Sequence, residues 1–263
     1  MPEMPEVEAV CRKLRAEAVG RRIRAVKISR CATPAVAELA AGKSIKAVDR
    51  KGKHILIRLS GSITVHVHLR MTGNLFWVPD HRFHTARARV VFELSDLSGV
   101  IYEDPRALGK LHAAPSDEVD EGLGEIGPEP LTPEFTWARF HETARASRQP
   151  AKLFLMDQTK VAGLGNIYAA EALFRAKVNP KRSMCRIGKP KLESLFGAIL
   201  EVLGDAVQSA ERAYSGPGEF GEAESFPLAV YDREGEACDV CGRTVRRIRQ
   251  GGRSTYYCPS CQR

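Results

Sequence analysis

The four cysteines near the end of the chain constrain its fold more than any other feature. They form two Cys-X2-Cys pairs, Cys238 with Cys241 and Cys258 with Cys261, separated by sixteen residues. This spacing is typical of a structural zinc site, in which four thiolates complete a tetrahedral shell and leave no position open for a substrate. The alternative is a redox or disulfide role, which a reducing compartment disfavours. We therefore predict one structural Zn²⁺ held by these four cysteines.

The segment between the two cysteine pairs predicts a β-hairpin. Residues 244–249 and 254–257 have strand character, and residues 250–253 (QGGR) have the composition of the turn that joins them. Residues 238–263 contain one acid, Asp239, against six arginines: Arg243, Arg246, Arg247, Arg249, Arg253 and Arg263. Basic side chains on such a hairpin are typical of DNA binding, and we expect Arg253 at its tip to reach the backbone.

The overall charge agrees with a polyanionic partner. The chain of 263 residues has a formal net charge of +8, which favours nucleic acid, and the alternative is a basic solvated surface without such a partner. Its length allows one large or two ordinary domains plus a small module. We find no signal peptide and no apolar run long enough to cross a membrane, so we expect a cytoplasmic protein.

Residues 21–112 alternate between apolar and polar side chains with period two. The alternation is clearest at 55–59, 63–70 and 88–94, and predicts antiparallel strands in a sandwich or barrel. His66, His68 and Arg70 would share one strand face. That face can bind phosphates or be merely solvated, and a metal is disfavoured because no carboxylate joins them at ligand spacing.

A basic turn interrupts the strands at residues 50–53 (RKGK). Lys53 at its tip can reach a phosphate or a reacting base, or the segment can be an ordinary exposed turn. The segment 113–133 is acidic and rich in glycine and proline, which indicates an interdomain linker.

From about residue 134 the pattern becomes helical. Apolar runs at 153–156 and 167–174 flank a glycine-rich turn that ends in Asn166, which indicates a helix-turn-helix. The second helix would offer N–H groups to a phosphate, or Asn166 can simply be an N-cap within a helical bundle. One face of a further helix is apolar, through Leu192, Leu195, Phe196, Ile199, Val202 and Ala206. Residues 215–227 have the composition of a loop.

The first eight residues (MPEMPEVE) combine a proline with several carboxylates. Removal of Met1 would leave Pro2 with a free secondary amine, whose pKa near ~8 leaves a useful neutral fraction. Such an amine can attack an electrophilic carbon and form an imine, and Glu3 and Glu6 can assist proton transfer. Alternatively, the proline and acids can simply start a helix, which the periodic residues up to Ala18 predict.

Several separated motifs together resemble the formamidopyrimidine-DNA glycosylase family and its sister enzyme endonuclease VIII. They lie at 2–8 (PEMPEVE), 51–53 (KGK), 68–73 (HLRMTG), 104–106 (DPR), 157–158 (DQ), 161–170, 230–231, 233–236 and 251–259. The N-terminal form is closer to the purine-lesion branch. The resemblance implies an α+β chain of two domains. An antiparallel β-sandwich with an N-terminal helix would precede a helix-two-turn-helix domain with a four-cysteine zinc finger.

The resemblance also implies a bifunctional DNA glycosylase and abasic-site lyase of base excision repair. It would excise oxidised purines (8-oxoguanine and formamidopyrimidines) through an imine with Pro2, followed by β,δ-elimination. Glu3, Lys53 and Arg253 would complete the catalytic set, and Glu6 would line the lesion pocket. The residues expected to bind DNA are His68, Met71, Arg106, Leu108, Lys152, Asn166 and Tyr231.

Two positions depart from the family pattern. Leu108 stands where purine-specific members usually have phenylalanine, and residues 208–227 differ from the usual loop over oxidised guanine. The exact lesion and the opposite-base preference therefore stay open. Met71 would help to fill the gap left by a flipped base, although its place after a regular strand by itself predicts a core residue.

The expected divisions are a catalytic sandwich at 2–112, a linker at 113–133, a helix-two-turn-helix domain at 134–227 and a zinc finger at 228–263. The partner would be double-stranded DNA with oxidised bases or abasic sites. We expect a monomer in the bacterial cytoplasm, associated with the nucleoid through DNA. The alternatives are an endonuclease VIII-like enzyme for oxidised pyrimidines and a non-catalytic zinc DNA-binding protein that needs no Pro2 amine.

Overall fold

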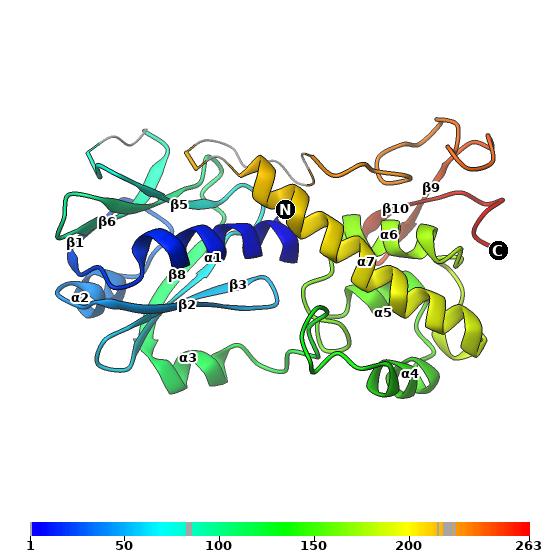
Figure 1. Cartoon of the computed structure of the whole chain (residues 1–263), viewed down its shortest axis with the longest axis horizontal. Coiled ribbons are helices and arrows are strands. Elements are labelled where there is room, and N and C mark those ends of the chain that lie inside the picture. The colour runs from blue at the N-terminus through cyan, green and yellow to red at the C-terminus, as the bar shows by residue number, and fades with distance from the viewer. Residues whose placement is uncertain (1, 83–85, 215, 218–222, 224) are drawn as a thin grey trace. The chain divides into compact units, whose positions relative to one another are not determined.

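The chain folds into two compact units in a computed structural model (Figure 1). The first unit comprises residues 1–124 and 210–224, and the second comprises 125–209 and 225–263. The structure describes residues 2–82, 86–214, 216–217, 223 and 225–263.

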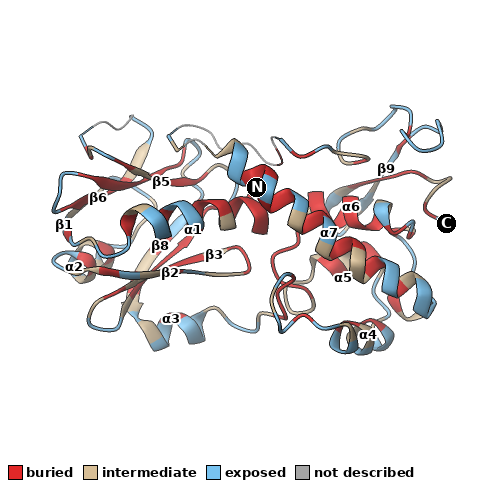
Figure 2. Ribbon diagram, viewed as in Figure 1, coloured by how far each residue is buried: buried red, intermediate tan, exposed pale blue. Residues whose placement is uncertain are grey.

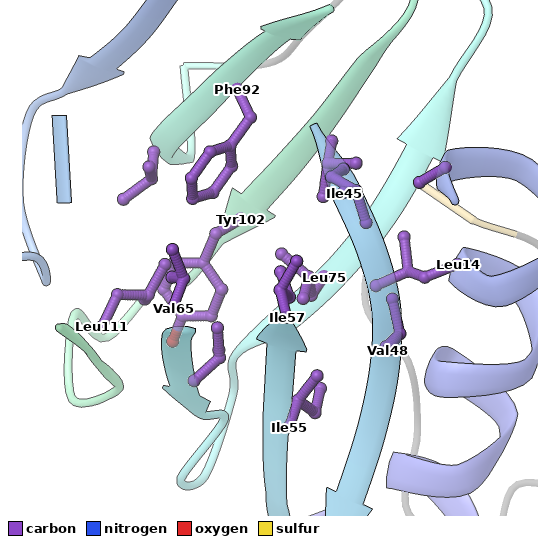
Figure 3. Close-up of a cluster of buried hydrophobic side chains, with 14 of the residues drawn as sticks. Leu14, Ile45, Val48, Ile55, Ile57, Val65, Leu75, Phe92, Tyr102 and Leu111 are labelled. Carbon is purple, nitrogen blue, oxygen red and sulfur yellow. The ribbon is translucent and has the colours of Figure 1, made fainter. Parts of the chain in front are cut away.

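The first unit is a sandwich of two four-stranded antiparallel sheets, as predicted. One sheet has the order β1 (Ile23–Ile28), β6 (Ala88–Leu94), β7 (Gly99–Glu103), β5 (Asn74–Val78). The other has the order β2 (Ile45–Lys51), β3 (His54–Leu59), β4 (Ile63–His68), β8 (Lys110–Pro115). Apolar side chains from both sheets meet in one core, in which Ile57, Val65, Phe92 and Tyr102 lie (Figure 3). The period-two pattern forms this core because alternate side chains of each strand point inward.

Helix α1 (Met4–Ala18) packs against this sandwich through the apolar residues that the sequence pattern identified. The helix ends as predicted, because Gly20 takes the left-handed conformation (φ +89°) just beyond its C-cap, Val19. The Arg15 guanidinium then ties the helix to β2 by donating to the Val48 carbonyl oxygen at 2.7 Å. A short helix, α2 (Ala35–Ala40), completes the N-terminal part of the unit.

Regular structure occupies the first half of the segment expected to be a linker. Strand β8 continues to Pro115 because it pairs with β4, and helix α3 (Ser116–Gly122) follows. The acids at 117 and 118 lie in the first turn of α3, where the helix dipole favours negative charge. The acidic residues of the segment 113–133 therefore begin a helix, in addition to the expected role of the segment as an interdomain linker.

The second unit is helical. Its helices are α4 (Trp137–Ala146), α5 (Ala151–Met156), α6 (Asn166–Arg175), a 3₁₀ turn η1 (Met184–Arg186) and α7 (Lys189–Ala213), which continues into the first unit from Ala210. The predicted glycine-rich turn joins α5 to α6, and α6 is buried over most of its length (Figure 2). None of the helices in the described ranges has the length and hydropathy that a membrane span requires.

Helix α7 runs further than expected, because residues 208–213 form its last turns instead of opening the loop assigned to 208–227. Val207 and Ala210 extend the apolar stripe of the helix, and no glycine or proline occurs between Gly204 and Gly216. Of the remaining loop, residues 215, 218–222 and 224 lie outside the described part of the chain.

The zinc-finger hairpin has the predicted form. Strands β9 (Arg246–Gln250) and β10 (Arg253–Tyr257) pair antiparallel, with Arg253 opposite Gln250. Gly251 (φ +54°) and Gly252 (φ +77°) form the turn, which needs two left-handed residues and so suits a Gly-Gly pair.

Candidate active site and nucleic-acid interface

The start of α1 holds the residues expected to carry the chemistry. Pro2, Glu3 and Glu6 are all buried, and the Glu3 N–H donates to Glu6 Oε2 at 2.7 Å in a capping box. The helix-start interpretation therefore applies to this segment. It does not compete with a chemical role, because the same bonds hold two carboxyl groups immediately beside Pro2.

The basic turn between β2 and β3 is tied to this helix. The Arg50 guanidinium donates to Glu8 Oε2 at 2.7 Å and to the Gly52 carbonyl oxygen at 3.0 Å. Burial raises the pKa of Glu8, but its hydrogen bonds with Arg50 and Arg15 outweigh burial and hold that pKa below its ordinary value. Lys53 follows this turn and is only 8% exposed. It is thus not the residue of an ordinary exposed turn.

The segment that follows α7 returns to the first unit and contacts the expected lesion pocket. The Ala223 N–H donates to Glu6 Oε1 at 3.2 Å, so Glu6 bridges the start of α1 and this segment. The Tyr214 hydroxyl donates to the Leu75 carbonyl oxygen at 2.7 Å, and Asn74 Nδ2 donates to the Gly216 carbonyl oxygen at 2.8 Å. These bonds anchor Tyr214, Gly216 and Ala223 on the first unit.

Two loops at one edge of the sandwich present large apolar side chains to solvent. Met71 is 47% exposed and Leu108 is 44% exposed, and the Arg106 guanidinium lies 3.8 Å from Met71 Sδ. The strand pattern by itself predicted a buried Met71, which is wrong because β4 ends at His68 and Arg70 (φ +57°) turns the chain outward. The structure thus places the Met71 and Arg106 side chains in contact and exposes Leu108 on the same loop as Arg106.

Asp104 organises these loops from a fully buried position. Its Oδ1 accepts from the Thr72 hydroxyl at 2.5 Å and from the Arg106 N–H at 3.2 Å. Its Oδ2 accepts from the N–H groups of Leu108 and Gly109 at 2.8 and 2.7 Å. Although burial raises the pKa of Asp104, these bonds keep it below the ordinary value. The motif at 104–106 was noted in the sequence, but this role depends on contacts that only the fold creates.

His68 belongs to a histidine cluster that the sequence did not reveal. His54 Nδ1 lies 2.7 Å from His66 Nε2, and His66 Nδ1 lies 3.2 Å from His112 Nδ1. His68 stacks edge-on against His54, with ring centroids 4.8 Å apart, and its Nδ1 accepts from the Arg70 N–H. His66 and His68 share a face as expected, whereas Arg70 lies beyond the strand. The cluster forms because β3, β4 and β8 place these rings in register.

In the second unit, Asn166 and Tyr231 lie side by side. Asn166 is the first residue of α6 rather than its N-cap, which is Gly165, and its Nδ2 lies 3.5 Å from the Tyr231 hydroxyl. The buried Glu171 carboxylate fixes residues 229–231 by accepting from their three N–H groups at 2.8–3.0 Å. Glu171 is a positioning residue that no sequence pattern had indicated.

Lys152 is buried, and its ammonium group donates hydrogen bonds to the zinc-finger hairpin. Its Nζ donates to the Ser254 carbonyl oxygen at 2.7 Å and to Thr255 Oγ1 at 2.9 Å. These bonds hold β10 next to Arg253, whose own side chain is exposed. The structure therefore connects Lys152 to the expected DNA contact through the hairpin.

The four cysteines of the zinc finger converge as predicted. All four Sγ atoms lie within 4.8 Å of one another, with 3.9 Å between those of Cys238 and Cys261 and 3.5 Å between those of Cys241 and Cys258. Zn–S bonds of ~2.3 Å in a tetrahedron place sulfur atoms ~3.8 Å apart, so the site fits zinc. With four thiolates as ligands the metal is structural.

Three family models match successive parts of the chain. They are the formamidopyrimidine-DNA glycosylase N-terminal domain at residues 1–111, the H2TH domain of the same enzymes at 126–215, and the zinc finger found in FPG and IleRS at 235–263. The two-domain α+β fold with a zinc finger is thus a DNA-repair glycosylase architecture.

Curated relatives cover the whole chain. The formamidopyrimidine-DNA glycosylases of Pelotomaculum thermopropionicum and Symbiobacterium thermophilum are 38% and 40% identical to it, over 100% of this chain and 99% and 89% of theirs. A solved complex of Lactococcus lactis Fpg with abasic-site DNA superposes with a TM-score of 0.88 at 30% identity, covering both chains fully. The chain belongs to the formamidopyrimidine-DNA glycosylase family, which comprises base excision repair enzymes for oxidised purines.

Proposed function

We propose that this chain is a bifunctional DNA glycosylase and abasic-site lyase that excises oxidised purines through an imine with Pro2. The observation that carries the proposal is the buried cluster of Glu3 and Glu6 immediately beside Pro2, in a chain that belongs to this family. Related solved complexes contain abasic-site DNA and DNA with N7-benzyl-Fapy-dG, which supports DNA of this kind as the partner.

In the proposed reaction, the free amine of Pro2 forms a bond to C1′ while the glycosidic bond breaks and the base leaves with a proton. Glu3 then donates a proton to the sugar-ring oxygen as the C1′–O4′ bond opens, which leaves an iminium ion on the proline nitrogen. Loss of a C2′ proton expels the 3′ phosphate, and a second elimination expels the 5′ phosphate. Glu6 contacts the lesion, and Lys53 supplies positive charge beside the reacting nucleotide.

DNA binding in this proposal uses both units. Met71, Arg106 and Leu108 fill the space left by the flipped nucleotide, which offsets the few kcal/mol of lost stacking. His68, Asn166, Tyr231 and Arg253 contact phosphates, and Lys152 holds the Arg253 strand. We assign catalysis to residues 2–112, connection to 113–133, DNA binding to 134–227 and the zinc finger to 228–263. We further propose a monomer in the bacterial cytoplasm, located at the nucleoid through DNA.

Borohydride trapping tests this function. The full chain is mixed with duplexes that carry 8-oxoguanine, an oxidised pyrimidine or an abasic site, and is then reduced. We expect a covalent adduct with the 8-oxoguanine and abasic duplexes, none from a chain extended before Pro2, and a weaker one from Pro2→Gly, whose N-terminal amine is primary. Tight binding without any adduct would leave only a non-catalytic zinc DNA-binding protein. An adduct with the pyrimidine lesion instead of 8-oxoguanine would favour the endonuclease VIII-like alternative.

A further inference from the structure

The second unit contains two adjoining hollows with strongly basic walls. One, of about 330 Å³, is lined by Arg243, Arg246 and Arg263 together with Thr244, Pro259 and Ser260. The other, of about 510 Å³, is lined by Lys181, Arg182, Arg186 and again Arg263, with Asn179 and Ser183. Because Arg263 lines both, we treat them as one surface, the distal groove, with six basic side chains and no acidic one in its wall.

The positive charge of this groove is not neutralised within the protein. Elsewhere in the same unit, Arg175 pairs with Asp205 at 3.1 Å and Arg247 pairs with Glu234 at 3.4 Å. Among the described residues, no carboxylate lies within ion-pair distance of the six basic groups of the distal groove. Unpaired guanidinium groups of this kind present fixed pairs of donors that match phosphate oxygens.

The two walls of the groove are held together by buried hydrogen bonds. Gln262, only 1% exposed, donates from Nε2 to the Val178 carbonyl oxygen at 3.0 Å and accepts from the Cys258 N–H at 2.9 Å. Asn179 Nδ2 donates back to the Gln262 carbonyl oxygen at 3.1 Å. The loop after α6 is thus fixed to the zinc finger, and the spacing of the basic groups is set before any ligand arrives.

The zinc-finger wall of the distal groove lies at the end of the hairpin opposite to Arg253. Arg246 pairs with Tyr257 at the open end of the hairpin, whereas Arg253 pairs with Gln250 beside the turn. Four residue steps of ~3.3 Å place the two ends ~13 Å apart. The Arg246 wall of the groove is therefore separate from Arg253. The other wall lies nearer to the turn, because the Pro180 carbonyl oxygen accepts from Gln250 Nε2 at 3.3 Å.

We propose that the distal groove binds the phosphate backbone of duplex DNA away from the lesion, as a second phosphate-binding surface of this enzyme. Two hollows in a row, joined at one arginine, suit a ligand with anionic groups at regular intervals. Binding of this kind is independent of sequence and of damage, so it strengthens the hold on undamaged DNA during search. The inference rests on the proposed function, because it takes DNA as the partner.

The test compares two double variants with the same loss of charge. Arg182→Gln/Arg263→Gln removes exposed groups of the groove, and Arg139→Gln/Arg175→Gln removes exposed arginines outside it. Equilibrium binding to a long undamaged duplex is measured between about 50 and about 200 mM salt. We expect the slope of log K against log salt to become shallower by roughly 1 to 2 in the groove variant, and to stay unchanged in the control.

A second measurement separates this inference from the proposed function. With enzyme in saturating excess, the single-turnover rate of 8-oxoguanine excision should be the same in the wild type and the groove variant, because the groove touches no reacting atom. Equal slopes in the two double variants of matched zinc content and Tm would overturn the groove proposal. Binding to polyglutamate, an acidic peptide, is measured in parallel. A groove variant that loses affinity for polyglutamate but not for DNA would also overturn the groove proposal. A wild-type chain that binds no duplex at all would instead overturn the proposed function.

Discussion

A Cβ atom added to Gly109 would lie 1.7 Å from the hydroxyl oxygen of Tyr102. Gly73, from the loop that presents Met71, faces the same hydroxyl, where a Cβ would lie 2.4 Å away. The Tyr102 ring is completely buried between the two sheets (Figure 3). The hydroxyl is therefore the point at which both exposed loops rest on the core, and only glycine fits at either contact.

Gly109→Ala should destabilise the protein by about 1–3 kcal/mol, because the new methyl group overpacks a closed site. Tyr102→Phe removes the oxygen that the methyl group would meet. The double variant should therefore lose less stability than the sum of the two single variants. Urea denaturation of all three measures this coupling. Strictly additive losses would show that the two residues do not share a contact.

Asp104→Asn should disturb the insertion of Met71, Arg106 and Leu108 into DNA more than it disturbs imine formation at Pro2. An amide group in place of one carboxylate oxygen faces N–H groups that need an acceptor, which costs about 1–3 kcal/mol. We expect slower single-turnover excision from an intact lesion pair, which requires base flipping. Borohydride trapping on a preformed abasic site should change little. Equal losses on both substrates would argue against a positioning role for Asp104.

Arg50→Gln should reduce both stability and trapping, because it frees the turn before Lys53 and leaves the Glu8 carboxylate without its closest partner. The side chains of Arg50 and Glu8 are 9% and 13% exposed. Loss of a hydrogen bond to a charged group costs about 1.5–3 kcal/mol, and Glu8 keeps Arg15 as a partner at 2.8 Å. Arg58→Gln, which breaks exposed pairs with Asp49 and Asp120, is the matched control and should have a small effect. Thermal melts and trapping rates on the abasic duplex measure both effects.

Removal of zinc should unfold the hairpin and spare the sandwich. Cys238→Ser removes one zinc ligand, and a strong chelator removes the metal itself. Either treatment breaks the link between the two cysteine pairs, so Arg253 loses its fixed position. We expect duplex affinity to fall at least tenfold, while strand-rich circular dichroism from the first unit persists. Cys185→Ser, outside the cluster, controls for loss of a thiol. Unchanged affinity after verified loss of zinc would contradict this expectation.

The histidine cluster should make the first unit sensitive to acid. Burial is the main cause that lowers the pKa of His54 to about 4, of His66 to about 3 and of His68 to about 4, from an ordinary 6.5. The unfolded chain binds these protons near pH 6.5 while the folded chain does not. Stability is therefore complete above pH 6.5 and decreases as pH falls towards 4.

His66→Gln should flatten this dependence, because His66 links His54 to His112. Melting temperatures of the wild type and the variant between pH 4 and pH 7.5 provide the measurement, at about 2–4 °C for each kcal/mol. His141→Gln, a histidine outside the cluster, should leave the dependence as it is in the wild type. Parallel curves for the wild type and His66→Gln would exclude the cluster as the source.

The local patterns of the sequence determined the elements of this protein. Alternation at 55–59 and 88–94 predicted strands because a half-buried strand must repeat every two residues. Gly251 and Gly252 predicted the hairpin turn because its backbone needs two left-handed residues. The spacing of the cysteines predicted zinc because the tetrahedral shell accepts few arrangements.

The tertiary structure decided what those patterns could not, because it depends on contacts between residues far apart in the chain. Met71 follows a regular strand and looks like core, but the turn at Arg70 carries it to the surface. The cluster of His54, His66 and His112 exists only because three strands pair in one register. Lys152 looks like a surface cation, yet the hairpin encloses it. Burial and partners of this kind arise only when the units fold.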